Sequence, residues 1–163
     1  MTSNIAALIL TKNEELHLER CILSIKKLVS EIYVIDSGST DKTKIISEKH
    51  KVKFLENKFY NYSSQFNWGL NHVRKDNFEW VLRIDADEFF TPKLNNELKN
   101  LLKNINQKFS GIAINRKIIF DGKILNYGGT TTKQLRIFRP HLGYCEYSFM
   151  DEHIKVKGKV KMI

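Results

Sequence analysis

Short apolar runs alternate with segments of helical periodicity through the first two thirds of the chain, and this order restricts the fold more than any other feature. Strand-like apolar runs lie at 5–10, 31–35, 52–56 and 80–84. Apolar residues spaced three and four positions apart predict helices after these runs, at 18–28, just beyond 40, at 60–74 and at 92–105. Repeated strand–helix units predict an α/β fold in which a parallel sheet carries helices on both faces.

Two of the expected helices carry local start signals. Ser39 or Thr40 can cap a short helix, and Asp41 would then lie in its first turn, where negative charge is favourable. Thr91 followed by Pro92 is a second start signal, with an N-cap hydroxyl and a proline at the first helical position.

The pattern changes after residue 110. The segment 111–125 contains two strand-like runs around Asp121-Gly122, a pair typical of a β-hairpin turn. A further strand-like run at 134–139 stops at Pro140. The last third is therefore predicted to be mixed or antiparallel β, and a length of 163 residues favours one domain.

Polar clusters directly follow three of the predicted strands. They are Thr11 to Glu14, Asp36 to Asp41, and Asp85 to Glu88. Ligands of open parallel sheets bind beyond the carboxyl ends of the strands, so these clusters predict one binding site at one sheet edge.

The Asp85-Ala86-Asp87 element suggests what that site could hold. Side chains two apart on an extended segment point the same way, so the two carboxylates share a side. Such a pair suits a hard divalent cation, Mg²⁺ or Mn²⁺, which prefers oxygen ligands and bridges to phosphates. The alternative is a strand-to-loop turn in which one Asp caps a helix.

Charge and cysteine content restrict the possible partners and the cellular compartment. A net charge of +9 is compatible with a nucleotide, nucleic acid or acidic membrane as partner, or with a lysine-rich solvated surface. The two cysteines lack metal-site spacing and fit a reducing cytosol. Neither a signal peptide nor a membrane span is recognisable, so we expect a cytoplasmic protein, in peripheral contact with the inner membrane face if it docks there.

Four segments follow one another over residues 5–90: "TKNEE" after the first strand, "IYVIDSGSTDKT", "YSSQFNWGL" and "WVLRIDADEFF". In their order and spacing they resemble glycosyltransferase family 2, the GT-A type nucleotide-sugar transferases. A narrower likeness, to bacterial members that build lipopolysaccharide core or other surface glycans, rests on "QLRIFRP" and "FMDEHI". The second segment departs from the family, because Ser37 stands where an acidic residue is commoner.

The resemblance implies a GT-A, Rossmann-like sheet flanked by helices. It assigns nucleotide-sugar binding to 1–90 and the acceptor side to 91–163 of the single domain. The residues implied to hold a UDP-sugar, with Asp36 reading the base, are Thr11, Asn13, Glu14, Asp36, Ser37, Gly38, Ser39, Asn67, Arg83, Asp85 and Ala86. The implied ligands of Mg²⁺ or Mn²⁺ are Asp85, Asp87 and His153.

The resemblance also implies inverting sugar transfer to a glycan or lipid-linked acceptor. A carboxylate must take the proton of the attacking acceptor hydroxyl, and Glu152, with Asp151 as its rival, is the expected base. The transition state would be oxocarbenium-like, as in glycoside hydrolysis.

Simpler roles stay open for several of these residues. Arg83 could neutralise the Asp cluster or touch the diphosphate, and Ser39 could be a helix cap. Asn67 and His153 could be surface residues.

Other functions account for some of the same features. A sugar-nucleotide pyrophosphorylase needs a glycine-rich loop after the first strand, and "TKNEE" has no glycine. A dehalogenase-type phosphatase normally carries its Asp-x-Asp after the first strand of its core, whereas here the motif comes late. A nucleic-acid-binding module fits the charge but not acids at strand ends, which repel phosphate. The chain ends soon after "FMDEHI", where family members usually continue, so a shortened, inactive sugar-nucleotide-binding domain is a further alternative.

Overall fold

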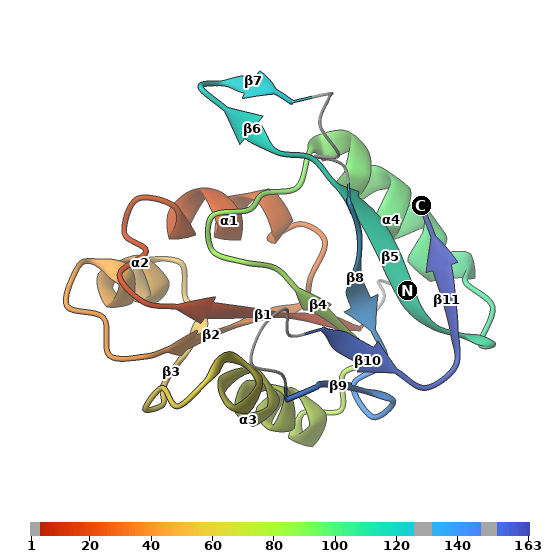
Figure 1. The fold of residues 1–163 in the computed structure, drawn as a ribbon, viewed down its shortest axis with the longest axis horizontal. Coiled ribbons are helices and arrows are strands. Elements are labelled where there is room, and N and C mark those ends of the chain that lie inside the picture. The colour runs from red at the N-terminus through yellow and green to blue at the C-terminus, as the bar shows by residue number, and fades with distance from the viewer. Residues whose placement is uncertain (1–3, 126–131, 148–152) are drawn as a thin grey trace.

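The computed structural model describes residues 4–125, 132–147 and 153–163. They form a central seven-stranded sheet with the order β11-β5-β8-β4-β1-β2-β3, together with two small two-stranded sheets (Figure 1). The strands of the central sheet are β1 Ile5–Thr11, β2 Glu31–Asp36, β3 Lys53–Glu56, β4 Trp80–Arg83, β5 Phe109–Arg116, β8 Thr132–Phe138 and β11 Lys159–Met162. The helices are α1 Leu18–Ile25, α2 Thr43–Lys49, α3 Tyr62–Lys75 and α4 Pro92–Asn104.

The first four strands form the parallel part of the sheet. β1 lies between β2 and β4 and is parallel to both, and β3 extends the sheet on the far side of β2. This arrangement confirms the α/β prediction. Thr11 and Asp36 end their strands directly opposite each other, so two of the predicted polar clusters start from the same level.

The later strands make the sheet mixed, as predicted. β8 is antiparallel to both β4 and β5, and β11 joins β5 in parallel at the sheet edge. The small sheets pair β6 Ile119–Phe120 with β7 Lys123–Ile124, and β9 Gly143–Cys145 with β10 Ile154–Val156. Asp121 and Gly122 both have positive φ, +48° and +70°, which confirms the predicted hairpin and gives it a type I′ turn.

Helices cover both faces of the sheet. The helices α1 and α4 pack on one face through residues such as Ile22 and Leu98, while α3 packs on the other face through Phe66 and Leu70 (Figure 1). At Gly69 the backbone of α3 comes so close to the sheet that an added Cβ would lie 2.7 Å from Ile35 Cγ1. Glycine there allows the helix to lie directly against β1 and β2.

One of the two predicted helix starts is confirmed and the other is wrong. Thr91 caps α4, accepting a hydrogen bond from the Leu94 N–H at 3.2 Å. The helix α2 begins only at Thr43, so neither Ser39 nor Thr40 is its cap. Ser39 and Thr40 instead form hydrogen bonds with Asn13, which follows β1, and Ser39 also bonds to Asp36 at the end of β2. These tertiary contacts override the local capping preference.

Candidate functional site

The carboxyl ends of β4, β1 and β2 lie side by side, as the polar clusters predict. The pKa of Glu14, which follows β1, reflects the same convergence. Burial raises the pKa of Glu14, and the nearby carboxylates of Asp87, Asp41 and Asp85 raise it further, while His17 opposes the shift. Residues from all three strand ends are therefore close enough to influence one another's charge.

Asp36 is the centre of the loop that follows β2. It is 1% exposed, and its carboxylate accepts hydrogen bonds from the Thr11 hydroxyl at 2.8 Å, the Gly38 N–H at 2.8 Å and the Ser39 N–H at 2.7 Å. The Ser39 hydroxyl donates a fourth bond, at 2.5 Å. These contacts give Asp36 a structural role in shaping the loop. The expectation that Asp36 reads a base stays a prediction.

The loops after β1 and β2 are joined by hydrogen bonds of 2.8 Å. The Asn13 N–H donates to the Ser39 hydroxyl, and the Thr40 N–H donates to the Asn13 side-chain carbonyl. The Glu14 N–H donates to the Thr43 hydroxyl. Asn13 adopts a left-handed backbone with φ of +56°, a conformation that asparagine tolerates better than most residues. The predicted positions Asn13, Glu14 and Ser39 thus belong to one rigid unit.

Lys12 brings a positive charge to this unit. Its ammonium donates to the Gly38 carbonyl at 2.6 Å and to the Ser37 carbonyl at 3.3 Å. Gly38 itself has φ of +84°, which suits glycine. No role was expected for Lys12 from the sequence, although its place directly after the first strand is a signal that could have indicated one.

Two arginines hold the acidic cluster after β4. Arg83 donates to both oxygens of Asp85, at 3.1 and 3.2 Å, and to the Tyr62 hydroxyl at 2.6 Å. Arg136 of β8, whose side chain is 4% exposed, bonds to Asp85 at 3.4 Å and forms an ion pair with Glu88. Arg83 is therefore a partner of the Asp cluster, and its contact with the diphosphate stays a prediction. Sequence reasoning missed Arg136, though an arginine inside the apolar run "LRIF" calls for a buried partner as Arg83 does.

Burial raises the pKa of Glu88, an effect that Arg136 opposes and Asp85 reinforces. The two arginines thus offset charge that would otherwise be costly to hold in a partly buried place.

Ala86 and Asp87 lie in a turn in which the Glu88 N–H donates to the Asp85 carbonyl at 3.0 Å, so the expectation of an extended Asp85-Ala86-Asp87 segment is wrong, and Asp87 is positioned differently from Asp85. It is exposed, and its backbone carbonyl accepts a hydrogen bond of 2.8 Å from Arg20. Within the described ranges, its carboxylate forms no hydrogen bond or ion pair, which suits a ligand for a hard cation shared with substrate phosphates. The pair Asp85 and Asp87 therefore fits Mg²⁺ or Mn²⁺ in the chemistry of its oxygens.

The rest of the predicted ligand set is not brought together. Among the residues that the structure describes, no three His, Cys, Asp or Glu side chains form a group able to hold a metal. His153 is exposed just before β10 and does not join Asp85 and Asp87 in such a group. Its role as a ligand stays a prediction.

Asn67 joins α3 to β9. Its side-chain amide donates to the Cys145 carbonyl at 2.8 Å and accepts from the Cys145 N–H at 2.9 Å. Contact between Asn67 and a nucleotide sugar stays a prediction. The expected catalytic residues, Asp151 and Glu152, lie outside the described residues.

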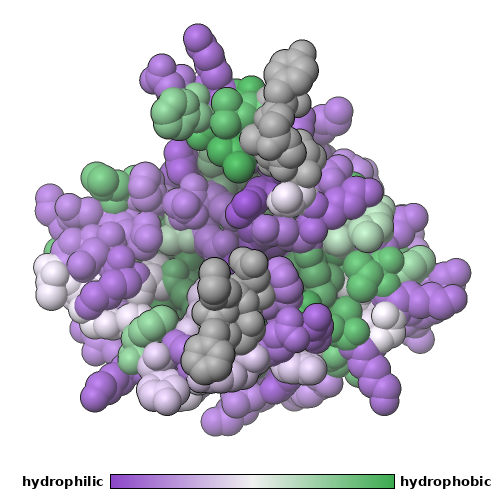
Figure 2. Space-filling view, viewed as in Figure 1, coloured by the Kyte–Doolittle hydropathy of each residue, from purple (hydrophilic) through white to green (hydrophobic). Residues whose placement is uncertain are grey.

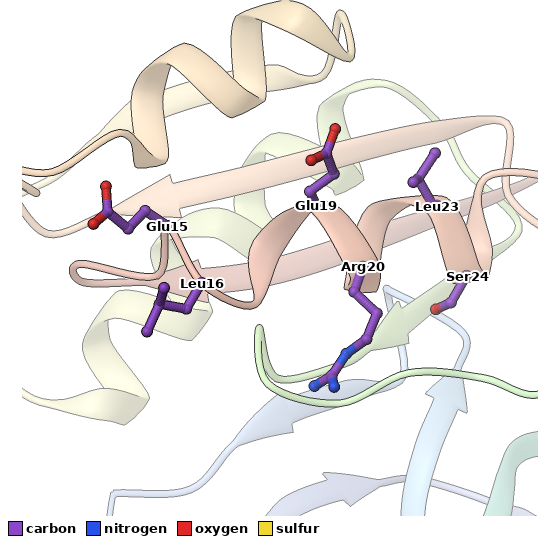
Figure 3. Close-up of a pocket in the computed structure, with 6 residues that line it drawn as sticks. All are labelled: Glu15, Leu16, Glu19, Arg20, Leu23 and Ser24. Atoms are coloured by element: carbon purple, nitrogen blue, oxygen red, sulfur yellow. The ribbon is translucent and has the colours of Figure 1, made fainter.

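A surface pocket of about 570 Å³ lies beside these elements (Figure 3). Its lining residues come from α1 and the turn before it: Glu15, Leu16, Glu19, Arg20, Leu23 and Ser24. Figure 3 shows these side chains on the outward side of α1 and the turn before it, with Arg20 directed toward the loop after β4. The strand-end residues that gather the polar groups do not line it, so we place the candidate site at the strand ends.

Comparison with known sequences gives a consistent family match. The family model for glycosyl transferase family 2 matches residues 7–155. An uncharacterized glycosyltransferase of Rickettsia bellii is 34% identical over 141 residues, covering 86% of this chain and 44% of the relative. The lipopolysaccharide core biosynthesis glycosyltransferase LpsC of Rhizobium meliloti is 30% identical, covering 62% of this chain and 36% of that protein. The chain thus spans less than half the length of these relatives.

Solved structures support the fold. The S. aureus TarS structure, residues 1–349, matches 98% of this chain and 58% of its own with a TM-score of 0.69 at 16% identity. M. tuberculosis glucosyl-3-phosphoglycerate synthase, crystallised with Mn²⁺, UDP-glucose and phosphoglyceric acid, matches 69% of this chain and 43% of its own. Its TM-score is 0.51 at 22% identity. At these identities the likeness concerns the fold alone, which confirms the expected GT-A architecture.

Proposed function

The chain belongs to glycosyltransferase family 2, and from this premise we propose that it binds a nucleoside-diphosphate sugar and takes part in transferring the sugar to a glycan or glycolipid acceptor. The observation that carries the proposal is the convergence of three polar strand ends, with Asp85-Ala86-Asp87 beside the joined loops after β1 and β2. Ligands of such sheets bind at this edge.

The donor is proposed to be a UDP-sugar. The joined loops present the region around Thr11, Asn13 and Ser37 at the strand ends, and Lys12 adds a cation suited to a diphosphate. The M. tuberculosis synthase, which shares the fold, was crystallised with UDP-glucose and Mn²⁺. That precedent supports the choice of donor.

Asp87 and Asp85 are the proposed ligands of Mg²⁺ or Mn²⁺. When bound, the cation would offset the negative charge that develops on the departing diphosphate. Arg83 and Arg136 fix Asp85 from the side of the sheet, whereas Asp87 faces solvent. Asp87 is thus the carboxylate better placed to meet an incoming cation.

Glu152 is the proposed base, with Asp151 as its rival. As the acceptor oxygen bonds to the anomeric carbon, the bond from that carbon to the diphosphate breaks and the acceptor proton passes to the carboxylate. Glu152→Gln should therefore cut the transfer rate by roughly 10²–10⁴-fold without weakening donor binding. A fully active Glu152→Gln protein beside an inactive Asp151→Asn protein would reverse the assignment.

The acceptor class is proposed from the relatives. LpsC is described as a lipopolysaccharide core biosynthesis enzyme, which favours a bacterial surface glycan or its lipid-linked precursor. Each helix in the described part of the chain is too short or too polar to cross a bilayer. We propose that the reaction takes place in the cytoplasm, at the inner face of the membrane.

Isothermal titration calorimetry with UDP tests the donor site directly. We expect binding that tightens when Mn²⁺ is added, and a melting temperature that rises accordingly. Asp87→Ala should abolish the effect of Mn²⁺, while Glu97→Ala, which removes an exposed acid on α4, should not. Absence of UDP binding in the presence of Mn²⁺, or an unchanged Mn²⁺ effect in Asp87→Ala, would refute the proposed site.

A further inference from the structure

The hairpin formed by β6 and β7 exposes large apolar side chains. Phe120 is 72% exposed, and Ile118, Ile119, Ile124 and Leu125 are between 37% and 48% exposed. Figure 2 shows hydrophobic surface over this hairpin at the top of the molecule, next to strongly hydrophilic side chains. A contiguous patch of exposed apolar side chains on a protein surface marks an interaction site.

The hairpin is built to project from the body of the protein. Its strands pair with each other in a separate two-stranded sheet, with Ile119 opposite Ile124 and Phe120 opposite Lys123. Every residue from 115 to 125 is exposed, and the hairpin extends beyond the central sheet in Figure 1. Its apolar side chains therefore contribute little to the core, and their exposure needs another explanation.

Basic residues surround the apolar tip. Arg116 at the end of β5, Lys117 before β6 and Lys123 in β7 are exposed, against the single acid Asp121 in the turn, and the whole chain has a net charge of +9. Apolar side chains that enter the interface, combined with cations that attract anionic lipid headgroups, are what a peripheral membrane anchor requires.

The hairpin stands at the same sheet edge as the candidate site. β4 ends next to Asp85. Because β8 runs antiparallel to both β4 and β5, the end of β5 and the start of β8 lie at the same edge of the sheet as the end of β4. The hairpin follows the end of β5 at this edge. Arg136 of β8, which contacts Asp85 and Glu88, lies only a few residues beyond the start of that strand. A surface bound by the hairpin would therefore face the edge where the polar strand ends gather.

We propose that the β6–β7 hairpin docks the protein on an anionic membrane by inserting Phe120 and Ile119 into the lipid interface, with Lys117 and Lys123 on the headgroups. The docking depends on the lipid surface and not on the sugar donor. It therefore holds even if the proposed donor is wrong.

Co-sedimentation with vesicles tests the apolar part of the proposal. The whole chain should bind vesicles of phosphatidylglycerol and phosphatidylcholine and bind pure phosphatidylcholine far less. The double variant Ile119→Ser with Phe120→Ser should lower the partition coefficient roughly tenfold or more, because two apolar side chains lose their lipid contact. The control Leu23→Ser removes a side chain that is 56% exposed on α1 and should leave binding unchanged.

A matched pair of charge variants tests the electrostatic part. Lys117→Gln with Lys123→Gln should weaken binding roughly 25-fold, about fivefold for each cation. Lys26→Gln with Lys27→Gln removes the same charge from exposed positions after α1 and should have little effect. Equal losses in both double variants would mean that only net charge matters, which would overturn the hairpin as the docking element.

Fluorescence locates the inserted residue. A Phe120→Trp protein should be quenched by vesicles of brominated lipid, whereas the wild-type tryptophans should not, since Trp80 is fully buried and Trp68 packs against the core. No quenching, or no vesicle binding by the wild type, would overturn the proposal. A change of oligomeric state on Ile119→Ser with Phe120→Ser in the absence of lipid would assign the hairpin to self-association instead.

Discussion

The strand-end cluster, which comprises the polar residues that follow β1, β2 and β4, and the β6–β7 hairpin lie at the same edge of the sheet. The two regions are built in opposite ways. At the strand ends polar groups hold one another, as in the four hydrogen bonds to Asp36 and the ion pairs of Arg136. The hairpin instead exposes apolar side chains such as Phe120. The difference indicates that the first region is organised before any ligand arrives, and that the second depends on a surface outside the molecule.

Removing Arg136 should give the largest loss of stability in this comparison. Arg136→Met leaves Asp85 and Glu88 without a charge partner from β8, and we expect the free energy of unfolding to fall by about 2–4 kcal/mol at neutral pH. Urea denaturation followed by circular dichroism would measure it. Arg116→Met, at an exposed position of β5, is the control and should change stability by less than about 0.5 kcal/mol.

The pH dependence of that loss identifies its cause. Burial raises the pKa of Glu88 in the folded protein, and loss of Arg136 would raise it further. A carboxyl group with a raised folded pKa binds more protons in the native state, so its contribution to stability falls as pH rises through the interval between its unfolded and folded values. The deficit of Arg136→Met should thus be small at acid pH and grow toward neutral pH. A deficit independent of pH would indicate lost packing instead of uncompensated charge.

Asp36→Asn should have the next largest effect. The amide keeps the shape of the side chain, but its NH2 group must replace one of two accepting oxygens, either the one bonded by the Gly38 and Ser39 N–H groups or the one bonded by the Thr11 and Ser39 hydroxyls. We expect a loss of about 2–3 kcal/mol. If Asn at this position were tolerated with full stability and UDP binding were lost, Asp36 would act on the nucleotide and the structural interpretation would be wrong.

Asn13 should contribute less, through its backbone as well as its side chain. Asn13→Ala removes the acceptor for Thr40 and puts alanine at a φ of +56°, for an expected loss of about 1–2 kcal/mol. Asn13→Gly loses the same hydrogen bond but adopts the left-handed backbone readily. Thermal unfolding of the two variants separates these contributions, and an alanine variant as stable as the glycine variant would show that backbone strain is unimportant there.

The sequence was sufficient to predict the parallel strands, the start of α4 and the hairpin turn, because each depends on nearby residues. Apolar runs gave the strands, Thr91 with Pro92 gave the helix start, and Asp121-Gly122 gave the turn. The convergence of the strand ends also followed, since adjacent parallel strands place their carboxyl ends together.

Features that depend on distant pairings could not be predicted. Ser39 has the composition of a helix cap, but its contacts with Asn13 and Asp36 hold it outside α2. The insertion of β8 between β4 and β5 brings Arg136 to the acidic cluster, and no local pattern indicates which strand lies beside β4. Similarly, the amide of Asn67 is engaged by Cys145, which is far away in the sequence.

The smallest effect on stability is expected at the hairpin, and it separates the two regions most clearly. The variant Ile119→Ser with Phe120→Ser changes exposed side chains in a two-stranded sheet outside the central one, so the free energy of unfolding should change by less than about 0.5 kcal/mol. The same variant is expected to lose vesicle binding, whereas Arg136→Met should lose stability and, once folded, still bind vesicles. Denaturation and co-sedimentation on both variants therefore give opposite results if the regions are independent. A large loss of stability in the hairpin variant would mean that Phe120 packs within the protein in solution, and its exposure could then not be attributed to a membrane.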